Sequence, residues 1–212
     1  MELTIEEARA LYGNADSGHD FDHILRVLAL VARIGEAEGA DRGVLRVATL
    51  LHDWGRVEAD SKSLDHAAEA AARARDLLLA RGEGADWIEA VTHAIAAHRF
   101  RSGPEPRTLE AKVLFDADKL DAIGAIGIAR VFAYSGAHSQ RLWAPRDTID
   151  LARWQESGDD PTEHTAVHEF VVKLSRIKTR LYTETGRVIA EDRHRFMVDF
   201  FQRLDAEVLG ER

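Results

Sequence analysis

Two adjacent residues that can bind a metal ion end an apolar run in the first quarter of the sequence. The mostly apolar segment Ala48-Thr49-Leu50-Leu51 leads directly into His52 and Asp53, and Gly55 follows. Glycine commonly ends a helix, so the pair is predicted to lie at the end of a helix over about 41–54. A carboxylate among leucines needs a partner. A bound cation is one such partner and a buried arginine is another.

A histidine upstream lies on the apolar face of its predicted helix. His23 shares a stripe with Val27, which points its ring inward. Arg26 lies on nearly the same face, where it could hold a phosphate or a carboxylate. The simpler alternatives are a hydrogen-bonded core histidine and an ordinary salt bridge. His19 shares a face with His23 and stays an alternative ligand.

Three acids lie close together in the helix predicted from Thr108. Asp116 shares its stripe with lysines at 112 and 119, which predicts an exposed, salt-bridged carboxylate. Asp118 shares an otherwise apolar stripe with Asp121, so Asp118 is predicted to face inward. Asp121 could then orient a metal-binding side chain or the substrate without binding the metal itself.

Several further side chains could contact a phosphate, although each alone is more often solvated or capping. His93 and His98 are five residues apart and do not share a helix face, so they are poor partners for one metal. The candidates are Lys62, His66, His93, His98 and Arg101.

Composition narrows the possible chemistry. The 212 residues contain no cysteine, so metal ligands must be His, Asp or Glu. The composition is 45% hydrophobic and 31% charged, typical of a globular protein. The formal net charge of −9 argues against nucleic acid or an anionic membrane as the main partner. With neither a signal-like N-terminus nor a membrane-length apolar run, the expected location is the cytoplasm.

Helical periodicity runs through the chain, and no stretch shows strand-like alternation. We predict an all-α helical bundle forming a single domain over residues 1–212. The 136–164 segment, with Pro145 and Pro161, is predicted to be a long functional or mobile loop. Two further helices over 165–209 are predicted to close the chain.

The order of these residues resembles a known family. His23, then His52-Asp53, then Asp118 is similar to the HD-domain superfamily of metal-dependent phosphohydrolases. The match covers about 17–134, and its motifs resemble a bacterial branch that includes nucleotide pyrophosphohydrolases. The Gly-Tyr-Pro signature of the cyclic-dinucleotide branch is missing, as is the Glu-Asp pair of the stringent-response branch. The resemblance implies a helical HD-type fold, with His23, His52, Asp53 and Asp118 as metal ligands.

Two imidazoles and two carboxylates suit one divalent ion, such as manganese, iron, nickel, cobalt, zinc or magnesium. An ion that accepts six ligands would have two coordination positions left open by these four side chains. One would hold an activated water and the other a phosphoryl oxygen. Asp53 could orient the water, while Arg26 and His66 could stabilise charge on the leaving phosphate. The predicted substrate-binding residues are Arg26, Lys62, His66, His93, His98 and Asp121.

We therefore predict a metal-dependent phosphohydrolase that acts on a nucleotide or another small phosphoanhydride or phosphoester. One alternative is a di-iron oxygenase of HD fold, because His66, His93 and His98 could serve a second metal. Another is a non-catalytic nucleotide sensor. The sequence leaves the substrate, the metal and any homo-oligomer open.

Overall fold

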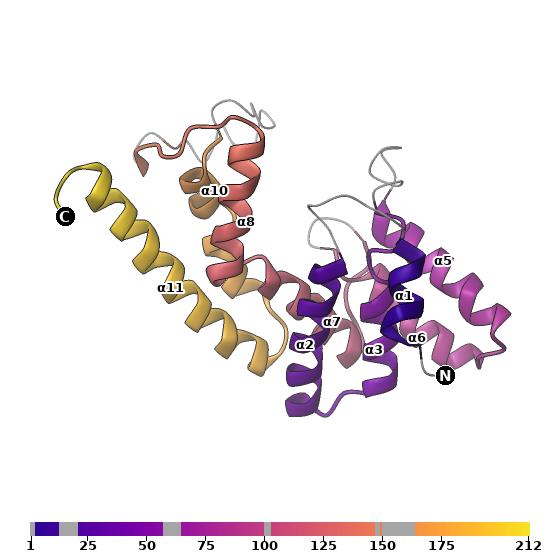
Figure 1. Cartoon of the computed structure of the whole chain (residues 1–212). Coiled ribbons are helices and arrows are strands. Elements are labelled where there is room, and N and C mark those ends of the chain that lie inside the picture. Colours follow the sequence, from indigo (N-terminus) through magenta and orange to yellow (C-terminus); the bar gives the residue numbers. More distant parts are fainter. Residues whose placement is uncertain (1–2, 13–20, 57–64, 100–102, 147–148, 150–163) are drawn as a thin grey trace. The chain divides into compact units, whose positions relative to one another are not determined.

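The computed structural model describes residues 3–12, 21–56, 65–99, 103–146, 149 and 164–212. Every regular element in those ranges is helical, which confirms the all-α prediction (Figure 1). The elements are α1 (Ile5–Tyr12), α2 (Phe21–Glu38), α3 (Arg42–Leu51), α5 (His66–Ala80), α6 (Ala85–Ala96), α7 (Leu109–Asp121), α8 (Gly124–Ala137), α10 (Ala166–Val172), the 3-10 helix η2 (Leu174–Arg180) and α11 (Glu184–Val208).

The chain forms two compact units. The first contains residues 1–118 and a short returning segment, 182–186; the second contains 119–181 and 187–212. The prediction of one domain over 1–212 stays a prediction.

Helix α3 is the centre of the first unit. It packs against α1, α2, α5 and α6. Seven of its ten residues are buried, which agrees with the mostly apolar sequence of this helix. A helix buried on most sides holds its C-terminal end in a fixed place, and His52 is the residue that caps that end.

Polar side chains cap the N-terminal ends of several helices in the first unit. Thr4 and Glu7 form the predicted reciprocal capping box, with backbone-to-side-chain hydrogen bonds of 2.9 and 3.1 Å. Asp41 caps α3 by accepting from two backbone N–H groups, and Asp65 caps α5 in the same way. Gly55 has φ +86°, a conformation that favours glycine, as expected for the turn after the His-Asp pair.

The prediction for Asp116 is wrong. Its side chain is fully buried within the first unit. The carboxylate accepts hydrogen bonds from the backbone N–H groups of Tyr182 and Thr183, at 2.9 and 2.7 Å, and from the Thr183 hydroxyl at 2.6 Å. The helix phase alone could not reveal partners 66 and 67 residues away in the sequence.

In the second unit, the end of α7 is followed by a sharp break. Gly124 begins α8 with φ +78°, which fits the predicted break near this glycine. The described residues include no single helix long and apolar enough to span a membrane. Helices α7 and α8 reach that length and apolar character only when they are taken together, and the pair is bent by 58°.

The C-terminal part differs from the two predicted helices. The first is the short helix α10, followed after Lys173 by the 3-10 helix η2. Lys173 has φ −131° and ψ −59°, outside the helical range, which separates the two. Near this break, Glu169 lies 3.1 Å from His164 Nε2 and pairs with Lys173. Burial opposes ionisation of Glu169, but these partners lower its pKa to about 2.

The predicted 136–164 loop begins two residues later than expected, because α8 continues through Ala137. Trp143 donates a 2.7 Å hydrogen bond to Asp205 of α11, so this part of the segment is fixed within the second unit. Most of the remaining segment, including Trp154, lies outside the described residues.

Candidate metal centre

The Asp53 carboxylate is the centre of a buried cluster of imidazoles. Its Oδ2 lies 3.8 Å from Nε2 of both His23 and His52. Its Oδ1 lies 3.6 Å from Nε2 of His98 and 3.8 Å from Nε2 of His66. Helix ends and helix starts supply these residues: α2 begins beside His23, α3 ends before His52, and α5 begins at His66.

The tautomer of His52 follows from its hydrogen bond. Nδ1 lies 2.8 Å from the Thr49 carbonyl, which can only accept, so Nδ1 carries the proton. Burial lowers the pKa of His52 to about 4, so the ring is neutral near pH 7. Its Nε2 lone pair therefore faces the Asp53 carboxylate, in the orientation that metal-binding histidines adopt.

Two groups of three side chains have atoms close enough to share a cation. His23, His52 and Asp118 form the first trio, and His52, Asp53 and His98 form the second. Within each trio, one potential ligand atom per residue lies within 4.8 Å of the others. The two trios have His52 in common.

His98 repeats the arrangement of His52. Its Nδ1 lies 2.6 Å from the Ile95 carbonyl, so its Nε2 is the atom directed at Asp53. The His98 ring contacts those of His52 and His66 at centroid distances of 5.0 and 5.6 Å. Sequence spacing did not predict that His98 would join a ligand group, because its position depends on the packing of α6 against α3 and α5.

The donor set fits a divalent cation. Among the described residues, His52 Nε2 and Asp53 Oδ1 are both buried and neither has a hydrogen-bond partner. Leaving such atoms unpaired costs about 1–3 kcal/mol each, and more for a charged group. An imidazole lone pair and a carboxylate oxygen that face one space are satisfied together by a cation.

Asp53 is held ionised. Burial opposes ionisation, but His52, His98 and Arg56 lower its pKa well below the usual value. Arg56 Nη1 donates to Asp53 Oδ2 over 2.9 Å. Arg56 lies three residues after Asp53, within reach of a side-chain pair, but its role was not predicted from the sequence.

Tyr12 is a second neighbour that sequence reasoning missed. Its hydroxyl donates a 3.0 Å hydrogen bond to the Leu50 carbonyl, just before the His-Asp pair. Burial and the Asp53 charge raise the pKa of Tyr12 well above its usual value. Tyr12 is therefore a neutral hydroxyl that fixes the end of α3.

The other predicted site residues are placed differently. His93 Nε2 accepts a 3.1 Å hydrogen bond from the Arg107 backbone and belongs to neither trio. Asp121 pairs at 3.0 Å with Arg130 within the second unit. Arg26 lies half-buried on α2, one turn after His23. Three predicted residues lie outside the described ranges: Lys62, His19 and Arg101.

Comparison with known proteins identifies the family. The HD domain model matches residues 20–123. YpgQ of Bacillus subtilis is 35% identical over 95% of this chain and 90% of its own length. The chain belongs to the HD-domain family. Outside the family model, the likeness to YpgQ extends over the C-terminal helices as well.

Solved HD-domain structures have the same fold. Bacillus subtilis YpgQ in complex with ADP has a TM-score of 0.72 and 33% identity, over 97% of this chain and 98% of that one. An HD-superfamily hydrolase from Bacillus thuringiensis has a TM-score of 0.74 and 31% identity, over 96% and 93%. The resemblance that the motifs indicated is thereby confirmed at the level of superfamily and fold.

Proposed function

We propose that this HD-domain protein is a metal-dependent phosphohydrolase that acts on a nucleotide or a related small phosphoanhydride or phosphoester. The observation that carries the proposal is a pair of unsatisfied buried atoms: His52 Nε2, from the residue that the two trios share, and Asp53 Oδ1, from the second trio. The ADP bound to the related YpgQ supports a nucleotide as the substrate class.

In this proposal His23, His52, Asp53 and Asp118 hold one divalent cation. Such a cation supplies a water of lowered pKa and polarises a phosphoryl oxygen. Manganese is our first choice because it accepts both imidazole and carboxylate ligands.

The surrounding side chains take the remaining roles. Asp53, held ionised by its neighbours, accepts a hydrogen bond from the attacking water through a carboxylate oxygen. Burial lowers the pKa of His66, and the positive charge of the nearby Arg56 lowers it further. His66 is therefore a neutral ring near pH 7, and it donates a hydrogen bond to a substrate phosphate. Arg26 and Arg56 provide the positive charge that balances the phosphate.

Metal removal tests the function directly. Protein stripped with a chelator is compared with protein reloaded with manganese, and phosphate and pyrophosphate release is measured over nucleoside di- and triphosphates and simple phosphoesters. We expect no turnover without metal and restored turnover with it. Full activity in verified metal-free protein would refute the proposal.

A variant pair connects the activity to the site. His52→Ala should lose both bound metal and turnover. His138→Ala is the matched control, because His138 is an exposed ring stacked on Tyr134 in the second unit. Nucleotide binding without turnover under every metal would instead favour a sensor.

One observation favours the di-iron oxygenase as a second candidate. His98 and His66 both face Asp53 Oδ1, on the opposite oxygen from His23. A second cation would have His66, His98 and Asp53 as its ligands. Metal counting by mass spectrometry decides between them: one ion per chain favours hydrolysis, whereas two irons with oxygen consumption favour the oxygenase.

A further inference from the structure

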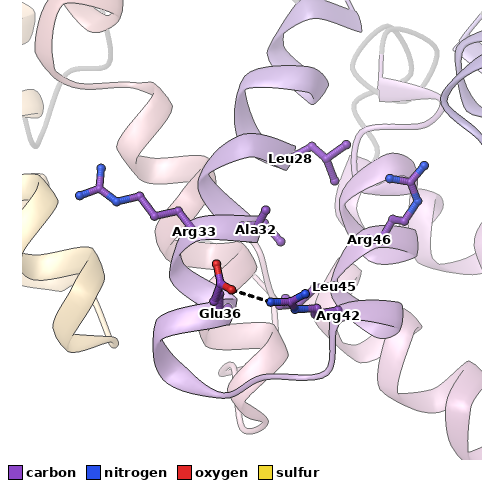
Figure 2. Close-up of a pocket in the computed structure, with 9 residues that line it drawn as sticks. Leu28, Ala32, Arg33, Glu36, Arg42, Leu45 and Arg46 are labelled. Carbon is purple, nitrogen blue, oxygen red and sulfur yellow. Dashed lines mark hydrogen bonds and ion pairs between the residues drawn. The ribbon is translucent and has the colours of Figure 1, made fainter.

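A cavity of about 380 Å³ lies between α2 and α3, at their connected ends (Figure 2). Small-molecule pockets usually span about 300–1,000 Å³, so this cavity falls at the small end of that range. Its lining includes Leu28, Ala32 and Glu36 from α2, and Arg42, Leu45 and Arg46 from α3.

The floor of this cavity is aliphatic. Val31 and Leu45 are each only 2% exposed, and Leu28 is half-buried. Gly35 lets the two helices approach closely, because a Cβ there would collide with Leu45 Cδ1. The floor has no aromatic ring, so it suits an aliphatic chain better than a stacked base.

Arg46 is the lining cation with a buried, unsatisfied donor among the residues that the structure describes. Its Nε is buried and makes no hydrogen bond, and Arg46 forms no ion pair with any residue of the described ranges. Its neighbours in sequence, Leu45 and Val47, are buried, so the base of its side chain is anchored while its guanidinium borders the cavity. A guanidinium in this position presents a donor fork that matches a carboxylate or phosphate.

Arg42 supplies a second, movable cation. It pairs with Glu36 at 2.8 Å, and both side chains are more than 70% exposed. Exposed pairs contribute little, about 0–1 kcal/mol, so Arg42 can turn to a ligand at small cost. Arg33 also borders the cavity, but Figure 2 shows it extended away from Arg42 and Arg46.

The charge of this lining contrasts with that of the whole chain. Three arginines and one glutamate line the cavity of a protein whose formal net charge is −9. A local cationic patch over an aliphatic floor is complementary to an amphiphilic anion.

We propose that the α2–α3 cavity binds a small ligand with a phosphate or carboxylate headgroup and an aliphatic body, with Arg46 as the headgroup anchor. This site is distinct from the metal centre, since His23 and His52 lie at the opposite ends of the same two helices. The proposal does not rest on the proposed phosphohydrolase function.

The test uses the full-length protein and two probes, hexylphosphonate and hexanoate, neither of which can be hydrolysed. Binding is followed by amide NMR shifts, with Gly35 and Gly43 as reporters near the cavity and His52 and Asp53 as reporters of the metal centre. We expect saturable millimolar binding with shifts at Gly35 and Gly43. The probe that binds more tightly identifies the headgroup.

Three variants locate the probe. Arg46→Gln should weaken binding about tenfold, as expected for a lost hydrogen bond between charged groups. Ala32→Glu should do the same by placing a carboxylate in the cavity on an exposed helical position. Ala29→Glu is the matched control, because Ala29 is exposed on α2 but does not line the cavity.

Chain length tests the aliphatic floor. Each methylene added to the probe should tighten binding roughly fourfold while the floor is being filled. The proposal is overturned if no saturable binding occurs, if the shifts appear at His52 and Asp53 instead, or if both cavity variants bind like the control.

Discussion

Replacing Asp116 by alanine should destabilise the first unit strongly. The buried carboxylate accepts from three donors on Tyr182 and Thr183, at 2.6 to 2.9 Å. Each hydrogen bond to a charged group contributes about 1.5–3 kcal/mol, but water entering the vacated space would recover part of the sum. We expect a net loss of about 3–5 kcal/mol, because the substitution leaves three buried donors without their acceptor.

The loss is measurable by equilibrium urea unfolding of metal-free protein, followed by far-UV circular dichroism. A loss of that size should lower the urea midpoint by roughly 1–2 M. Asp116→Asn keeps one acceptor oxygen and should fall between wild type and alanine. Asp76→Ala, at an exposed position of α5, is the control and should stay within about 0.5 kcal/mol of wild type.

An Asp116→Ala protein as stable as this control would refute the reasoning. It would mean that the carboxylate is solvated in the folded protein and that the segment at 182–183 does not pack on α7.

Three other changes have defined expectations. The pKa of Glu169 in the folded protein is about 2, below its ordinary value of 4.5, so its ionised form stabilises the folded state fully above pH 4.5. The free energy of unfolding should therefore fall by about 2–3 kcal/mol as the pH drops from 4.5 to about 2. Glu169→Gln should remove that pH dependence in urea unfolding. Arg56→Gln should weaken manganese binding about tenfold in a metal titration, because it frees Asp53 from its orienting partner. Gly35→Ala should cost about 1–3 kcal/mol in urea unfolding, because the new methyl group collides with Leu45.

Two of these changes have a matched control variant. Arg75→Gln, which breaks an ion pair with Glu89, should leave manganese affinity unchanged. Gly136→Ala, where a methyl group meets nothing, should not destabilise α8. Equal pH profiles for wild type and Glu169→Gln would contradict the buried ion pair, and a stable Gly35→Ala would show that the α2–α3 crossing is looser than described.

Much of the candidate site could be predicted from local pattern. His23 lies on the inner stripe of an amphipathic helix, and the His-Asp pair follows an apolar run, so both orientations follow from helix geometry. The structure brings His23, His52 and Asp118 together, as the stripes indicated. Their role as ligands stays a prediction that metal counting will test.

The parts that local pattern missed depend on tertiary contacts. Asp116 has lysines on its helical stripe, yet its carboxylate is covered by a segment 66 residues later in the chain. His98 reaches Asp53 only because α6 packs on α3. Helix periodicity specifies which face a residue occupies, but not what later in the chain will cover that face.

The dependence of Asp116 on residues 182–183 also sets an order of events during synthesis. A ribosome adding about 5–20 residues per second needs roughly 3–13 s to proceed from Asp118 to Tyr182. During that interval α2, α3, α5 and α6 are already made, but Asp116 has none of its three donors. The first unit is therefore expected to reach its final stability only late in translation, and a chain that stops before Tyr182 should expose α7 to chaperones and proteases.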